Sequence, residues 1–152
     1  MRSKVRQVLA AALVAGVAAS ANAQFRKPDD AIKYRQGVMF TMGNHFYSRI
    51  GGMVNGRIPF DAKAAADNAD LVVVLSRLPW VAFGPGTDQG ITDAKPAIWT
   101  DTAKFRDLSE KMQAEVLKLQ AAARTGDPEA LRVAYRATGA ACKSCHDQFT
   151  TQ

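Results

Sequence analysis

The sequence predicts an all-α protein that folds as an antiparallel four-helix bundle. Four segments carry apolar residues at helical spacing, and the connections between them are mostly short. No segment has the strict apolar and polar alternation that is typical of a half-buried strand. Helices joined by short connections pack beside each other in opposite directions, which is the arrangement of a four-helix bundle.

The first helix is expected to begin after Pro28, where Asp29 and Asp30 suit a cap and a first turn. Apolar side chains then recur at intervals of seven, three, four and four residues, at Ile32, Met39, Met42, Phe46 and Ile50. The glycine-rich stretch at residues 51–59 marks the expected end of this helix.

The second helix is expected from Asp61 to Pro79. Its segment LVVVL at residues 71–75 would also fit a strand, but the alanine-rich residues before it favour one long helix. Residues 80–96 contain glycines, aspartates and prolines with no period, so they predict a long loop.

The third helix is expected from about residue 98 or 101 to Thr125, and Gly126 ends it. The fourth helix begins with Asp127 as its cap and Pro128 at its first position, a pair that favours helix initiation. This last helix carries both cysteines of the chain and a histidine close to the C-terminus.

The first 23 residues have the features of a secretory signal. A basic front is followed by an apolar middle of about a dozen residues and by Ala-Asn-Ala before Gln24. The apolar middle is shorter than the roughly 20 residues that a membrane-spanning helix needs. We therefore expect a cleaved signal at residues 1–23, a single mature domain at residues 24–152, and a periplasmic protein with no membrane attachment after cleavage.

The charge of the chain depends strongly on this leader. Three basic residues and no acidic ones lie in it, so cleavage lowers the formal net charge from +6 to +3. The remaining charge is too small to favour nucleic acid as a partner. A mild excess of lysine and arginine does suit brief docking to an acidic protein surface, guided by long-range electrostatics.

The closing segment GAACKSCHDQF contains the chemically distinctive residues. Cys142, Cys145 and His146 stand at i, i+3 and i+4, so in a helix all three leave the same face. A disulfide between the cysteines would close too small a loop to stabilise the fold by chain entropy. C-x-x-C-H is the attachment pattern of c-type haem, in which two thiols form thioethers and the imidazole binds the iron. The pattern predicts one covalent haem c per chain.

The pattern of the closing segment leaves three other interpretations open. A redox dithiol would be expected at the start of a helix in a βαβ unit, whereas this pair lies at the end of an all-helical chain. A structural zinc site needs four ligands, and His45 is the only further cysteine or histidine. The third interpretation is two buried thiols and a helix-end histidine that bind nothing.

Four stretches of the chain resemble one protein family. They are QFRKPDDAIKYRQ at residues 24–36, LPWVAFGPGT at residues 78–87, KPAIW at residues 95–99 and the closing GAACKSCHDQF. Together they span the mature sequence and are similar to the cytochromes c′, the class II c-type cytochromes, whose haem is attached to the last helix of a four-helix bundle.

The resemblance implies a role for each of several residues. Cys142 and Cys145 would be the thioether attachments and His146 the proximal iron ligand. Further residues would contact the edge of the haem: Arg35 and Gln36 at its propionates, and Thr92 and Asp93 along its rim. A guanidinium can also pair with a carboxylate through two parallel hydrogen bonds, which independently supports Arg35 in this role. Relatives often carry a basic residue where this chain has Thr150.

Met39 is expected on the distal side of the haem, one turn beyond Arg35 and Gln36. Relatives with an open sixth position usually carry a bulky apolar residue there, whereas low-spin relatives bind the iron through a methionine of the first helix. A thioether is a genuine haem ligand, but a methionine on an apolar face also fills space without bonding. Both roles for Met39 are open, and Met42 is expected to pack in the core.

The haem attachment pattern and the resemblance to the cytochromes c′ together lead us to expect two functions. The first is binding of small gases such as NO or CO at a hindered iron, and the second is transfer of single electrons to a transient periplasmic redox partner that docks near Lys143. An enzyme is not expected, because His45 is the only acid–base candidate near the distal site. The family also implies a homodimer formed through the first two helices, to which residues such as Phe40, Tyr47, Met53 and Val54 could contribute if they face outward.

Overall fold

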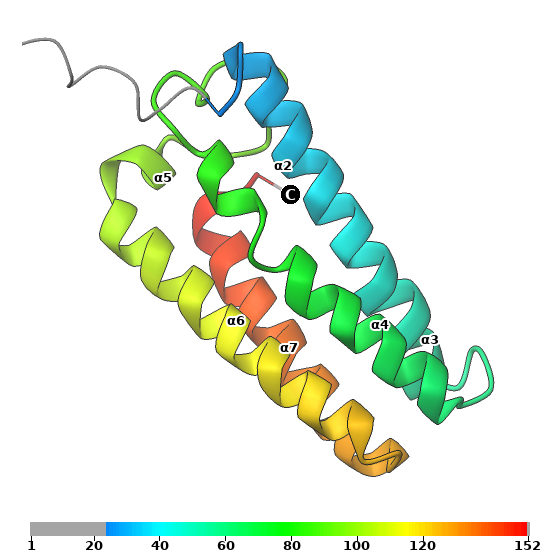
Figure 1. The fold of residues 1–152 in the computed structure, drawn as a ribbon. Coiled ribbons are helices and arrows are strands. Elements are labelled where there is room, and N and C mark those ends of the chain that lie inside the picture. Colours follow the sequence, from blue (N-terminus) through cyan, green and yellow to red (C-terminus); the bar gives the residue numbers. More distant parts are fainter. Residues whose placement is uncertain (1–23, 152) are drawn as a thin grey trace, which may run out of the picture.

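The protein is a four-helix bundle, as predicted (Figure 1). The computed structural model describes residues 24–151, so the predicted signal at residues 1–23 lies outside the described part. Its elements are α2 (Pro28–Gly43), the π-helix η1 (Asn44–Ile50), α3 (Gly51–Val54), α4 (Ala62–Leu75), the 3-10 helix η2 (Pro79–Ala82), α5 (Ala97–Thr100), α6 (Thr102–Arg124) and α7 (Pro128–Phe149). Within residues 24–151, no helix has the length and apolar character needed to cross a membrane.

The first long helical run ends at Val54, within the glycine-rich stretch at residues 51–59 that was expected to mark its end. The chain continues from α2 through η1 into α3, with helical backbone at Gly51 and Gly52. Gly51 serves a close contact, since a Cβ atom there would lie 2.5 Å from the hydroxyl oxygen of Tyr135 on α7. Gly51 therefore allows two helices to approach each other rather than ending the first.

Aspartate caps begin three of the four long helices. In each case the carboxylate accepts a hydrogen bond from a backbone N–H in the first turn, as an N-cap should: Asp61 at α4, Asp101 at α6 and Asp127 at α7. α2 differs, because its N-cap is Lys27 and makes no side-chain cap. Asp29 and Asp30 lie in its first turn, so the predicted aspartate cap of α2 was wrong while the acidic first turn was right.

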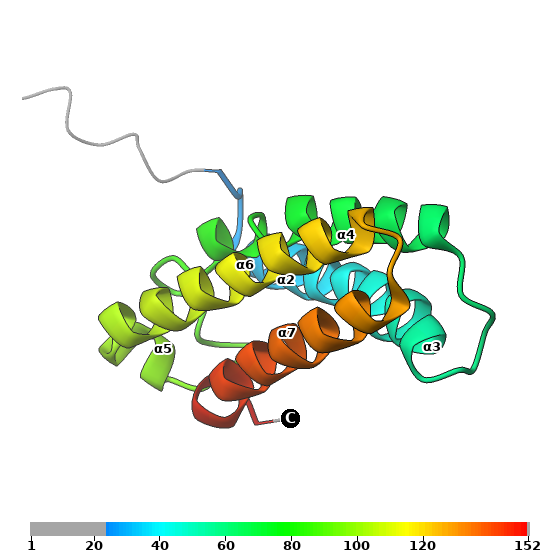
Figure 2. The same ribbon diagram turned by 90° about the horizontal axis from the view of Figure 1, so that it is seen from below.

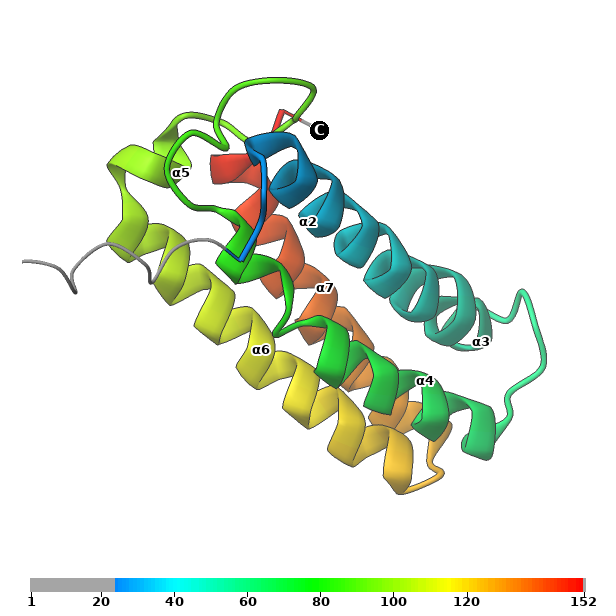
Figure 3. The same ribbon diagram turned by 45° about the horizontal axis from the view of Figure 1, so that its top comes forward.

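The helices pair unevenly around the bundle. α6 packs along both α4 and α7, whereas α2 packs mainly on α4 and on η2 (Figures 2 and 3). The segment between η2 and α5 crosses one end of the bundle and pairs there with the C-terminus. Ala94 and Thr150 form an isolated antiparallel bridge, and the Lys95 N–H donates to the Phe149 carbonyl at 2.9 Å. This segment thus joins the end of α7 to the rest of the bundle.

The buried side chains form two separate clusters. The larger one lies away from α5 and the C-terminus, and it includes Ile50, Val72, Val116, Leu119 and Leu131. The smaller one lies at the end where α5 and the C-terminus meet, and its buried members are Ile98, Leu108 and Phe149. Both clusters contribute walls to one cavity, which is therefore built into the core.

Candidate functional site

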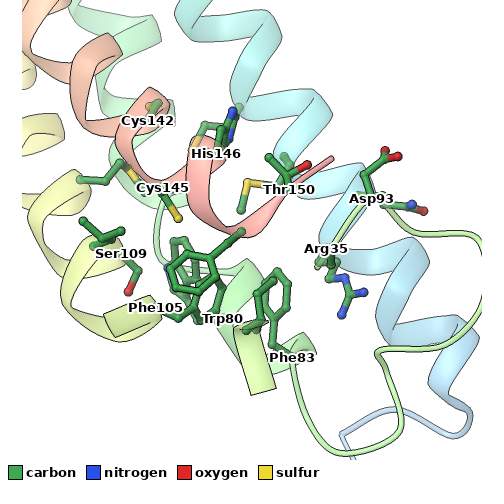
Figure 4. A pocket seen from close by; sticks show the side chains of 18 of the residues that line it. Arg35, Trp80, Phe83, Asp93, Phe105, Ser109, Cys142, Cys145, His146 and Thr150 are labelled. Atoms are coloured by element: carbon green, nitrogen blue, oxygen red, sulfur yellow. The ribbon is translucent and has the colours of Figure 1, made fainter. Parts of the chain in front are cut away.

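One cavity of about 510 Å³ gathers the residues singled out in the sequence. Its walls come from α2, η1, α4, α6, α7 and the segment between η2 and α5 (Figure 4). All eight predicted haem-contacting residues line it, namely Arg35, Gln36, Met39, Thr92, Asp93, Cys142, Cys145 and His146. Residues far apart in the chain therefore meet at one site whose volume is typical of ligand pockets.

The α7 wall carries Cys142, Cys145 and His146 within little more than one helical turn, as the spacing predicts. Both thiols are free and half-buried. Burial raises the pKa of Cys142 to about 11 and also raises the pKa of Cys145. His146 is exposed as a whole residue, but partial desolvation of its ring lowers its pKa, and the nearby Asp147 carboxylate opposes this shift. The imidazole is therefore held neutral at pH 7, which is the form that binds a metal.

Aromatic rings line the cavity beside Cys145. The centroid of Phe105 lies 4.9 Å from that of Phe83, 5.6 Å from that of Trp80 and 5.2 Å from that of Phe149. Each contact is edge-to-face, the arrangement that aromatic quadrupoles favour. The rings give the cavity a large, rigid and apolar surface (Figure 4).

Arg35 is buried, with only 3% of its surface exposed, and reaches the segment between η2 and α5. Nη1 donates to the Ala82 carbonyl and to Thr87 Oγ1, both at 3.1 Å. Nη2 donates to the Thr87 carbonyl at 2.8 Å and to Thr92 Oγ1 at 2.9 Å. The guanidinium carbon also lies 4.5 Å from the centre of the Phe83 ring. Burial lowers the pKa of Arg35, but from so high an ordinary value that the group keeps its charge.

Polar groups gather on the same side of the cavity. Gln36 Nε2 donates to the Ile91 carbonyl at 3.0 Å, and Thr92 Oγ1 also accepts from the Ala94 N–H at 3.2 Å. The Asp93 carbonyl accepts from the Thr151 N–H at 2.9 Å. The contacts of Arg35 and Gln36 with the haem propionates, and of Thr92 and Asp93 with the haem edge, remain predictions.

Met39 and Met42 both line the cavity from α2 and are half-buried. His45 does not line it, because its ring lies against α4, with Nδ1 2.8 Å from Asn68 Oδ1. Asn68 Nδ2 donates to the Ala64 carbonyl, so its Oδ1 is the acceptor and His45 Nδ1 carries the proton. His45 is thus occupied in holding η1 to α4.

Three polar residues of the site were missed in the sequence. Ser109 and Thr138 line the cavity, and their hydroxyls donate to main-chain carbonyls of α6 and α7. Thr87 accepts hydrogen bonds from the Arg35 guanidinium and so positions that side chain. It lies in an irregular segment. Helical spacing places Thr138 on the same side of the last helix as Cys142 without assigning it to the site, and no sequence signal pairs Thr87 with Arg35.

The residues present fit a covalently held haem. Two thiols and a neutral imidazole leave one helix face, flat aromatic walls offer apolar surface, and polar and cationic groups lie at one edge. The described residues contain no cluster of three or more histidine, cysteine or acidic side chains that could hold a bare metal ion. The fold and the site together define a c-type haem protein of the helical-bundle class.

Comparison with known proteins gives the family. The cytochrome c′ family pattern matches residues 30–150. Cytochrome c′ of Rubrivivax gelatinosus is 53% identical over 127 residues, which cover 83% of this chain and 98% of that protein. Its crystal structure has a TM-score of 0.80 at 52% identity and covers 84% of this chain and 99% of that one. The chain therefore belongs to the cytochrome c′ family, whose members bind haem c covalently.

A second relative provides structures with bound gases. A variant of cytochrome c prime from Alcaligenes xylosoxidans, in which one leucine is replaced by alanine, was solved as its nitric oxide complex. That structure has a TM-score of 0.79 at 44% identity. That match covers 85% of this chain and 99% of the other. Another variant of the same protein was solved with carbon monoxide bound, with the same TM-score and identity.

Proposed function

We propose that the protein is a periplasmic haem protein that binds NO or CO at a hindered iron site and exchanges single electrons. The observation that carries this proposal is the shared cavity, in which His146 lines the α7 wall and Met39 lines the α2 wall. Gas complexes of the relative from Alcaligenes xylosoxidans support it.

In this proposal the α7 wall holds the haem. Cys142 and Cys145 would hold the haem through thioethers, and His146 would supply a nitrogen ligand to its iron. When bound, the haem supplies an iron that takes a small gas and changes oxidation state by one electron. Phe149 and Phe105 pack beside the attachment site and exclude water from it.

The α2 wall controls access to the other face of the haem. We propose that Met39 fills the distal space by bulk without bonding the iron, so that an entering gas must displace it. Met39, Met42 and Phe46 carry no hydrogen-bond donor in their side chains. Such a wall favours neutral NO and CO over O₂, whose bound form gains more from a donor.

The polar edge of the cavity would neutralise the haem propionates. Arg35 contributes its positive charge there, while Gln36, Thr92 and Asp93 contribute polar atoms along the rim. All four terminal Arg35 hydrogen bonds described above end on the protein, so its effect on the propionates acts mainly through its charge.

We propose that no substrate is turned over and that electrons pass to a transient partner near Lys143. Lys143 lies on the exposed side of α7, where it pairs with Asp147. A homodimer through α2 and α4 is consistent with the exposed apolar residues Phe40, Leu71 and Val74 on these helices, although Met53 is buried and cannot contribute. Export with cleavage after residue 23 is part of the same proposal.

Titration of the reduced protein with CO and with NO tests the gas-binding function. We expect each gas to change the Soret spectrum with a single saturable transition, and CO to bind slowly because it must displace Met39. A reduced protein whose spectrum stays unchanged at saturating CO and NO would contradict the proposal.

A further inference from the structure

Two sets of contacts connect the principal walls of the cavity: the continuation of α2 packs on α7 at one end, through Phe46, Gly51 and Tyr135, and one segment of the chain joins the walls at the other end. α2 carries Met39, and α7 carries His146, but α2 packs mainly on α4 and η2 while α7 packs mainly on α6. The segment at residues 82–95 runs from the η2 end of the bundle to the C-terminus of α7. At this end of the bundle, it therefore links the distal and proximal sides of the site.

Arg35 holds the first half of this segment to α2. Its four terminal hydrogen bonds reach acceptors on Ala82, Thr87 and Thr92, at distances of 2.8 to 3.1 Å. Its guanidinium also stacks against Phe83 and lies 5.6 Å from the Trp99 ring centre. Trp99 Nε1 in turn donates to the Gly84 carbonyl at 3.1 Å. We call Arg35 with its three acceptor residues the Arg35 clasp.

The second half of the segment is bonded to the end of α7. The Lys95 N–H donates to the Phe149 carbonyl and the Thr151 N–H donates to the Asp93 carbonyl, both at 2.9 Å. The Thr150 N–H donates to the His146 carbonyl at 3.0 Å. Thr92, the last acceptor of the clasp, directly precedes the paired residues 93–95, so a continuous chain of contacts joins Arg35 to the turn that carries His146.

Met39 is one turn from Arg35 on α2, so whatever fixes Arg35 also fixes the position of Met39 along the cavity. We propose that the Arg35 clasp sets the separation between the α2 and α7 walls, and thereby how closely Met39 confines the distal face of the haem. Arg35 is in this sense a positioning residue. The proposal rests on the proposed function, because it assigns a consequence for gas binding.

Two variants break the clasp in different ways. Arg35→Lys keeps the charge but loses the planar fork that reaches three residues at once, and Thr92→Val removes one acceptor. Because hydrogen bonds to a charged group are among the stronger ones, we expect CO to bind the reduced holoprotein about tenfold faster in Arg35→Lys and about threefold faster in Thr92→Val. Thr41→Val is the matched control, since its hydroxyl bonds only within α2.

Amide hydrogen exchange supplies a readout that does not depend on gas binding. The Lys95 and Thr151 amides should exchange about tenfold faster in both clasp variants, while the Val116 amide in the middle of α6 should exchange as in the wild type.

The outcomes separate the two proposals. CO rates within twofold of wild type in both variants would overturn the inference, and so would an Arg35→Lys protein that matches wild type in rate and exchange. If wild-type protein itself does not bind CO, the proposed function fails. The clasp is then judged by amide exchange alone, and unchanged exchange at Lys95 and Thr151 overturns it.

Discussion

The α7 wall and the α2 wall of the cavity are built on different principles. On α7, three reactive side chains lie within five residues, and the geometry of one helix brings them to the same face. On α2, the proposed role of Met39 depends on contacts that the neighbouring Arg35 makes with residues about 50 positions later in the chain. In the proposed function, the α7 wall holds the haem, whereas the α2 wall determines what the haem can bind.

The largest effect is expected when the α7 wall loses its thiols. In the double variant Cys142→Ser, Cys145→Ser no thioether can form, so the haem should be lost completely on denaturation. A haem stain on a denaturing gel, with each single variant as control, measures this. The single variants should keep a covalent haem through one bond, and a stained band in the double variant would refute the attachment sites.

The same wall is expected to show unusual thiol chemistry before haem attachment. Because burial raises the pKa of Cys142 from 9.0 to about 11, its thiolate is about a hundredfold scarcer than that of an ordinary cysteine at pH 7. Alkylation of the haem-free chain should therefore be slow at pH 7 and rise up to about pH 11. By linkage, burial of the neutral thiol favours folding below about pH 9, and this contribution is lost as the pH rises towards 11. Rapid alkylation at pH 7 in the folded chain would contradict this burial.

Both walls rest on the larger apolar cluster, and Leu119 is one of its fully buried residues. Leu119→Ala should lower the free energy of unfolding by about 3 kcal/mol, through lost burial and the cavity left behind. Leu117→Ala is the matched control on the same helix, because 45% of Leu117 is exposed and the loss there should be below about 1 kcal/mol. Chemical denaturation measures both values. Equal losses in the two variants would show that α6 does not pack as described.

Truncation of the α2 wall should affect ligand access and leave haem attachment intact. Met39→Ala should speed CO binding by about tenfold or more, because the gas no longer has to displace a side chain from a packed site. Met42→Ala, also a lining residue on α2, should change the rate by less than about threefold. Stopped-flow mixing with CO measures the two rates. If both variants bound CO faster by a similar factor, Met39 would not confine the distal face of the haem more than Met42 does.

The sequence carried the local features of this protein well. Helical spacing and the Asp127–Pro128 start predicted α7, and C-x-x-C-H predicted the chemistry of its face, because both depend on neighbours along the chain. The close contact of Gly51 with Tyr135 was not predicted, because Tyr135 is distant in sequence. The Arg35 contacts with Thr87 were missed for the same reason, since an irregular segment has no period that could reveal its partner.

The central claim is that Met39 closes the distal side of the haem by bulk and does not bond the iron. The optical spectrum of the oxidised wild-type protein tests this claim most directly. We predict a high-spin spectrum with no far-red band from sulfur-to-iron charge transfer. A low-spin Soret pattern with that far-red band, lost in Met39→Ala, would contradict the claim and make the protein a His146/Met39-ligated electron carrier.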